Sequence, residues 1–124
     1  MQKVTVLVPL ATGFEEIEAI TIIDVLRRAE ITVVTAHVTP DSVVVGSHGL
    51  GVRADASLKG VLDQNFSAVV LPGGMPGTTN LAKSRELKSI LERHRDNSAY
   101  IAAICAAPTI LAEQGFLNGK SATC

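Results

Sequence analysis

The sequence has no tryptophan, one tyrosine and three phenylalanines in 124 residues, so aromatic side chains make up only 3% of it. Apolar residues are still 47% of the chain and are mostly valine, isoleucine, leucine and alanine. This is the usual filling of a parallel sheet covered by helices on both faces. No apolar run approaches the ~20 residues of a membrane span. The run at residues 4–10 is too short and too β-branched for a signal peptide.

Cysteines, histidines and clustered charge are also scarce. Two cysteines, Cys105 and Cys124, are too few for a disulfide framework, so we expect a cytoplasmic, reducing location.

The net charge is −1 and there is no basic cluster, so we expect no nucleic-acid partner. Because the sequence has no membrane span, we expect no membrane partner either. No two histidines have metal-ligand spacing, so we expect no metal. Neither a G-x-G-x-x-G nor a P-loop pattern is present, and we expect no cofactor. His94, flanked by charged residues, is expected to be exposed, whereas His48 lies in a glycine-rich loop and is a candidate pocket residue.

The order of predicted elements indicates an α/β fold with a mostly parallel sheet. Apolar, β-branched runs predict strands at residues 3–9, 32–38, 68–71 and 100–104, and a glycine-broken hairpin at 43–54. Helical spacing predicts helices at 14–28, 84–95 and 106–114. Thr12 and Glu15 have the spacing of a capping box, Asp55 is expected to cap a short helical turn, and Ser121 to begin a further strand.

Three features fall at the carboxyl ends of predicted strands. They are the loop at residues 11–13, the Pro72-Gly73-Gly74 loop and Cys105. Because ligands of such sheets bind beyond the carboxyl ends of the strands, we expect these three features to form one site.

Cys105 is the strongest candidate for a catalytic residue. Small residues surround it in the segment AAICAAP (102–108), as a sharp strand-to-helix turn requires. At the start of a helix, backbone amides and the helix dipole would stabilise a thiolate. The amides of Ala106 and Gly74 would then donate to an oxyanion on a bound carbonyl. The alternative is that Cys105 is a small buried core residue.

Three glutamates lie in the first turn of the first predicted helix, where a negative charge interacts favourably with the positive end of the helix dipole. Exposure to solvent is one interpretation of Glu15, Glu16 and Glu18. Glu18 shares a stripe with Ile22, where a carboxyl would be partly buried and would favour its protonated form. It could then donate to the cysteine sulfur or act as a general acid. Helical periodicity alone does not choose Glu18 over Glu15, because residues 20–26 are apolar on nearly every side of the predicted helix. Glu15 therefore stays a candidate pocket residue.

Five motifs along the chain resemble the DJ-1/ThiJ/PfpI family. They are GFEEIE (13–18), DVLRRA (24–29), DASL (55–58), VVLPGG (69–74) and AAICAAP (102–108). The resemblance spans essentially the whole chain. It is nearest to the branch of Parkinson-disease protein 7-like deglycases and glyoxalases.

The resemblance implies a flavodoxin-like three-layer sandwich, similar to class I glutamine amidotransferases, and a homodimer built partly on the first helix. It implies that Cys105 is an oxidisable nucleophile and Glu18 its protonated partner. Gly73, Gly74 and Ala106 would form the backbone around the oxyanion. Family members extend well beyond this chain, so residues 1–124 are expected to be one domain that is incomplete at its C-terminus. The remainder is expected either as a companion C-terminal fragment, a separate chain after cleavage, or as a segment that was lost or left out. His48 stands where relatives often carry an arginine.

The resemblance also implies alternative activities. One is a cysteine-dependent glyoxalase or protein deglycase that acts on methylglyoxal and early glycation adducts, with small aldehydes or glycated molecules as substrates. Another is a non-enzymatic oxidative-stress sensor or chaperone that works through oxidation of Cys105. Amidase or peptidase chemistry is less favoured, because the sequence offers no suitable histidine for a Cys–His–Glu triad.

Overall fold

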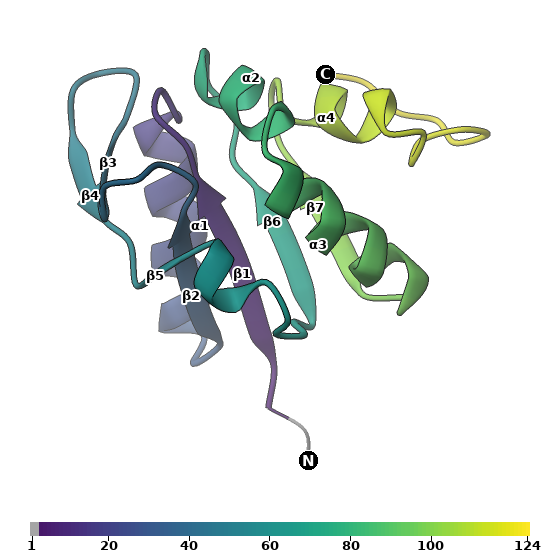
Figure 1. The fold of residues 1–124 in the computed structure, drawn as a ribbon, viewed down its shortest axis with the longest axis horizontal. Helices are drawn as coiled ribbons and strands as arrows, with labels where there is room; N and C mark the ends of the chain where they lie inside the picture. The colour runs from purple at the N-terminus through teal and green to yellow at the C-terminus, as the bar shows by residue number, and fades with distance from the viewer. Residues whose placement is uncertain (1–2) are drawn as a thin grey trace.

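A parallel five-stranded sheet forms the centre of the protein in the computed structural model, which describes residues 3–124 (Figure 1). The strand order is β5-β2-β1-β6-β7, and every neighbouring pair is parallel. The strands are β1 (Thr5–Leu10), β2 (Thr32–His37), β5 (Ala56–Ser57), β6 (Ala68–Leu71) and β7 (Tyr100–Ala103). The predicted α/β class and mostly parallel sheet are confirmed.

Helices cover the two faces of this sheet (Figure 1). Helix α1 (Glu16–Arg28) lies on one face, and a small antiparallel ribbon, β3 (Val43–Val45) with β4 (Gly51–Arg53), packs on the same side through Val44. The opposite face carries α2 (Gly77–Ala82), α3 (Arg85–Asp96), α4 (Pro108–Glu113) and a 3₁₀ turn (Lys59–Val61).

The alternation of side chains along β1 divides the core into two layers. Leu7 belongs to the cluster beneath α2, α3 and α4, whereas Val6 and Val8 belong to the cluster beneath α1. Successive strand residues point to opposite faces, so a strand buried on both faces must be apolar throughout. This explains why the sequence shows an unbroken apolar run here.

Helix α3 shows how the sequence specifies one of the covering elements. Ser84 caps it by accepting a hydrogen bond from the Leu87 amide at 3.1 Å. Its apolar stripe and His94 are buried, and three basic residues occupy its last turn. The expectation that His94 is exposed is therefore wrong. The residue is 1% exposed, and its ring donates from Nδ1 to the Ile90 carbonyl at 2.7 Å and accepts from the Phe66 amide at 2.9 Å.

Several predicted boundaries were wrong for local reasons. Glu15, not Thr12, caps α1, because the Glu15 carboxylate accepts from the Ile17 amide. Asp55 does not cap a helix; its carboxylate accepts from the Thr35 amide at 3.0 Å, beside the short strand β5. Residues 77–82 form α2, which was not predicted, α4 spans only Pro108–Glu113, and residues 121–124 form no strand.

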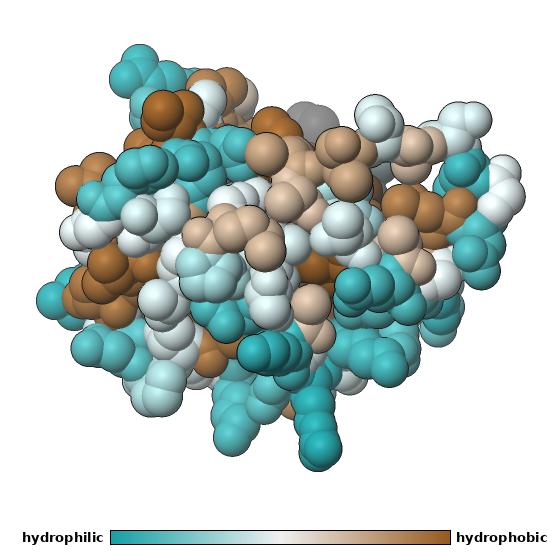
Figure 2. Space-filling model, turned by 90° about the horizontal axis from the view of Figure 1, so that it is seen from above, coloured by the Kyte–Doolittle hydropathy of each residue, from teal (hydrophilic) through white to brown (hydrophobic). Residues whose placement is uncertain are grey.

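The surface at the carboxyl edge of the sheet is mixed. Seen from above, apolar and polar residues are interspersed across it (Figure 2). Within the part of the chain that the structure describes, no helix is both long enough and apolar enough to cross a membrane.

Candidate active site

Backbone hydrogen bonds join the loops after β1 and β6 at the carboxyl edge of the sheet. The Glu15 amide donates to the Gly73 carbonyl at 2.9 Å, and the Gly77 amide donates to the Gly13 carbonyl at 3.1 Å. Gly13 has φ +89°, and a side chain there would meet Gly77 and its neighbour. The sequence therefore needs glycine for these two loops to approach, and the predicted convergence of strand ends occurs here.

Cys105 lies in the turn between β7 and α4, and its thiol side chain is exposed. Its φ is +58°, in the left-handed region that costs a non-glycine residue about 1–2 kcal/mol. The Ala107 amide closes the turn on the Ile104 carbonyl at 3.0 Å, and Ala107 is fully buried. The position agrees with the predicted sharp turn, and the exposure argues against a buried core cysteine.

Glu18 and Cys105 are neighbours across Gly73. The Gly73 amide donates to Glu18 Oε1 at 2.9 Å. A methyl group added to Gly73 would lie 2.6 Å from that oxygen and 2.8 Å from Cys105 Cβ. The structure thus selects Glu18, which periodicity could not, as the carboxyl beside the cysteine.

Two backbone amides near Cys105 have no hydrogen-bond acceptor in the described part of the protein. Within residues 3–124, the amides of Gly74 and Ala106 donate to no protein acceptor. Gly74 has φ +97°, and a side chain there would collide with the Glu15 amide. Free donors beside an exposed thiol are what addition to a carbonyl requires.

Glu15 is the N-cap residue of α1, and His48 lies in the loop between β3 and β4, against the first turn of that helix. His48 Nδ1 is 3.7 Å from Glu15 Oε1 and 3.0 Å from Glu16 Oε1. Solvent exposure was one interpretation of Glu16 from the sequence, but this residue is only 5% exposed. Burial alone would raise the pKa of Glu16, but hydrogen bonds from His48 and Leu50 outweigh it and lower the pKa to about 2.

The same three side chains are the potential metal ligands of the described residues. One donor atom each from Glu15, Glu16 and His48 lies within 4.8 Å of the others. Both oxygens of Glu16 already accept hydrogen bonds from the protein. The absence of a metal stays a prediction.

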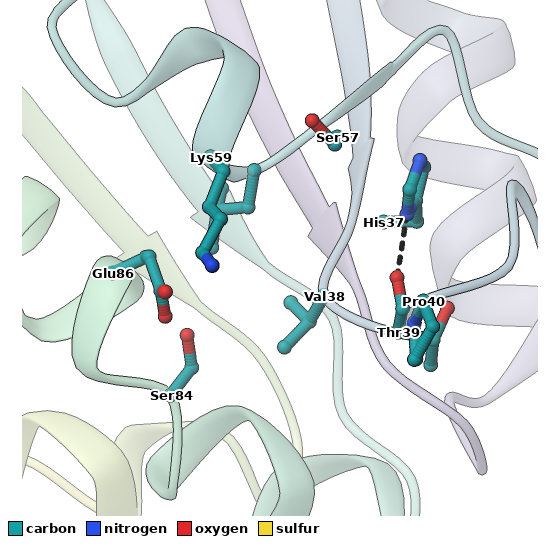
Figure 3. Close-up of a pocket in the computed structure, with 9 residues that line it drawn as sticks. His37, Val38, Thr39, Pro40, Ser57, Lys59, Ser84 and Glu86 are labelled. Carbon is teal, nitrogen blue, oxygen red and sulfur yellow. Dashed lines mark hydrogen bonds between the residues drawn. The ribbon is translucent and has the colours of Figure 1, made fainter.

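Two pockets open at the carboxyl edge of the sheet. One, of about 590 Å³, lies between α2 and α4 beside the cysteine and is lined by Met75, Thr79, Ala106 and Glu113, among others. The other, of about 460 Å³, lies at the ends of β2 and β5 and contains none of the predicted site residues. In it, Lys59 points toward Ser84 and Glu86, and His37 binds the Thr39 carbonyl (Figure 3).

The fold and this site define a class of protein, namely parallel α/β domains with a cysteine at a sharp strand-to-helix turn beside a glutamate. The chain belongs to the DJ-1/PfpI family, whose model matches residues 4–124.

Relatives and solved structures agree with this assignment. The chain is 43% identical to Protein dj-1beta of Drosophila melanogaster, covering 94% of the chain and 63% of the relative. It is 34% identical to glutathione-independent glyoxalase DJR-1.2 of Caenorhabditis elegans, covering 89% of the chain and 58% of the relative. The structure of oxidised Toxoplasma gondii DJ-1 superposes with a TM-score of 0.92 at 43% identity, covering 94% of the chain and 64% of that structure. The chain thus spans less than two thirds of each of these proteins.

Proposed function

We propose that this protein is a cysteine-dependent glyoxalase and protein deglycase. The observation that carries the proposal is the exposed thiol of Cys105, in a left-handed turn, with the Glu18 carboxyl across Gly73. The glyoxalase activity named for the C. elegans relative supports the substrate class.

In this proposal, the thiolate of Cys105 adds to the aldehyde carbon of methylglyoxal and forms a C–S bond. The carbonyl oxygen takes up the negative charge, and the free amides of Gly74 and Ala106 donate to it. The protonated Glu18 carboxyl first gives its proton to this oxygen. As a carboxylate it then accepts the proton that leaves the same carbon and delivers it to the neighbouring carbon, while the hydroxyl proton passes to the second oxygen, which gives a lactoyl thioester. Water then hydrolyses the thioester and restores the thiol. The sum is methylglyoxal plus water to lactate, without an external oxidant or reductant.

Early glycation adducts would undergo the same attack. Cys105 attacks the former aldehyde carbon of the adduct and forms a C–S bond, the bond from this carbon to the amine or thiol of the carrier breaks, and the carrier leaves with the proton that the cysteine thiol gave up. The pocket between α2 and α4, beside Ala106, offers room for the carrier.

A second candidate function is oxidative-stress sensing, with or without chaperone activity. In this case peroxide would oxidise the Cys105 thiolate to a sulfinate next to Glu18. The exposure of the thiol and the existence of an oxidised form of the Toxoplasma relative favour this candidate.

Lactate formation from methylglyoxal tests the first candidate against the second. We expect lactate with the wild-type chain and none above background with Cys105→Ala. Cys124→Ala removes the other exposed cysteine and should keep the activity. A folded wild-type chain that yields no lactate, but whose Cys105 is oxidised by peroxide, would favour the sensor.

We also propose two protein partners. Exposed apolar residues on α1, with Ile17 76% and Val25 55% exposed, support a homodimer built on that helix. Strand β7 is an edge of the sheet, and Tyr100 on it is 81% exposed. An uncovered edge invites a further segment, which supports a companion C-terminal fragment. Light scattering and intact mass spectrometry of the purified sample measure both.

The two free and exposed thiols, Cys105 and Cys124, support a cytoplasmic location, where thiols stay reduced. Fractionation of the source cells tests this.

A further inference from the structure

The loop between β3 and β4, residues 46–50, is fastened to the first turn of α1 by one buried carboxylate. Glu16 accepts hydrogen bonds from the His48 amide at 2.7 Å, His48 Nδ1 at 3.0 Å, the Leu50 amide at 3.2 Å and the Ser47 hydroxyl at 3.3 Å. A buried carboxylate that accepts several hydrogen bonds holds its partners in a defined geometry. Loop and helix therefore form one unit.

Backbone contacts tighten this junction. The Ser47 amide donates to the Phe14 carbonyl at 2.8 Å, and the Gly13 amide donates to the Val45 carbonyl at 2.9 Å. A side chain at Gly46 would collide with the Glu16 carboxyl. The loop thus lies directly on the carboxylate.

The same turn of α1 leads to the reactive cysteine. The Glu15 amide donates to the Gly73 carbonyl, and Glu18 accepts from the Gly73 amide. Gly73 in turn contacts Cys105 closely enough that no side chain fits between them. A displacement of the first turn of α1 would therefore move Glu18 relative to the thiol.

The charges around His48 favour its cationic form. The charged groups that face it are Glu15 and Glu16 of α1, and residues 46–50 contain no other titratable side chain. The hydrogen bond to Glu16 and the charges of Glu15 and Glu16 raise the pKa of His48. When His48 is protonated, the Glu16–His48 contact is an ion pair in which Glu16 is buried.

We propose that Glu16 and His48 are positioning residues, which hold the first turn of α1 so that Glu18 stays next to Cys105. Neither touches the reacting atoms. The inference rests on the proposed role of Cys105, and it assigns a task to two residues outside the nucleophile and its proton relay.

Alkylation of Cys105 by iodoacetamide, followed by mass spectrometry from pH 6 to 9, tests the proposal without requiring turnover. For Glu16→Gln, the lost negative charge and the displacement of Glu18 would change the alkylation rate in opposite directions. Loss of a negative charge alone would make the thiolate easier to form and alkylation faster. A displaced Glu18 and a loosened turn would make alkylation slower, by about tenfold at pH 7. Glu92→Gln, an exposed glutamate of α3, is the control and should match wild type.

The histidine is tested by two further substitutions, which remain informative if Glu16→Gln fails to fold. His48→Gln should slow alkylation about fourfold at pH 7, as expected for loss of an ion pair whose histidine is exposed. His48→Arg should restore the alkylation rate, since arginine keeps a positive charge and hydrogen-bond donors for the Glu16 carboxylate. A folded Glu16→Gln variant that alkylates at least as fast as wild type would overturn the proposal, as would equal rates for the two His48 variants. Absence of lactate with normal alkylation would count against the proposed activity alone.

Discussion

Gly73 is the point where three parts of the candidate site meet, so its replacement by alanine probes their packing directly. The added Cβ would lie 2.6 Å from Glu18 Oε1, 2.8 Å from Cys105 Cβ and 2.9 Å from the Ile104 carbonyl oxygen. Two of these atoms are backbone or Cβ atoms, which cannot rotate away. The φ of Gly73 is not positive, so the cost is steric and not conformational.

The effect of Gly73→Ala on stability depends on how many of the atoms that the added Cβ would meet are unable to move away. Inserting a methyl group into a well-packed site typically costs ~1–3 kcal/mol of stability. The strain also pushes Glu18 and the cysteine apart, which lengthens the 2.9 Å hydrogen bond between the Gly73 amide and Glu18. We therefore expect Gly73→Ala to lower the free energy of unfolding by about 1–3 kcal/mol and to slow alkylation of Cys105.

Urea unfolding followed by circular dichroism measures the first effect, and iodoacetamide labelling measures the second. Gly60→Ala is the matched control, because its added Cβ would meet only the Ser57 hydroxyl, at 3.0 Å, and a hydroxyl can rotate. The reasoning is refuted if Gly73→Ala matches Gly60→Ala in both measurements.

Two further predictions concern helix α3. Burial lowers the pKa of His94 from 6.5, so the unfolded chain binds this proton first and the histidine's contribution to stability decreases as the pH falls below about 6.5. His94→Phe leaves the Phe66 amide without its acceptor and should lower the free energy of unfolding by ~1–3 kcal/mol at pH 7.5. The variant should also lose less stability than wild type between pH 7.5 and 5.5. Urea titrations at the two pH values measure both effects, and a variant with the pH dependence of wild type would contradict the burial of a neutral His94. Ser84→Ala removes the acceptor of the Leu87 amide and should lower the free energy of unfolding by about 1 kcal/mol in the same assay. Ser89→Ala, at an exposed position of the same helix, is the control and should change it little. Equal losses for the two variants would show that Ser84 does not stabilise α3 as a cap.

Local sequence patterns predicted most of the sheet. The runs at 32–38 and 68–71 are apolar and β-branched because the strands they form, β2 and β6, have neighbours on both sides and layers on both faces. Helix α2 escaped prediction because Met75, Pro76 and Gly77 have the composition of a turn. It forms where Gly77 packs against the loop after β1, a contact that no local pattern encodes.

The fate of single polar residues was harder to predict. Glu16 and His94 both lie among charged neighbours in the sequence, and both are buried. Each is buried because distant backbone groups, the Leu50 amide for one and the Phe66 amide for the other, supply hydrogen bonds. Such partners are 34 and 28 residues away along the chain.

The sequence by itself determined the α/β class, the alternation of elements and the cysteine at the end of a strand, because these depend on side-chain periodicity and on small residues around one turn. Only the tertiary structure decided which glutamate stands beside Cys105 and which one holds the loop above α1. That choice depends on the packing of α1 against the Gly73 loop and the β3–β4 loop, where a shift of one residue turns a helical side chain by about 100°.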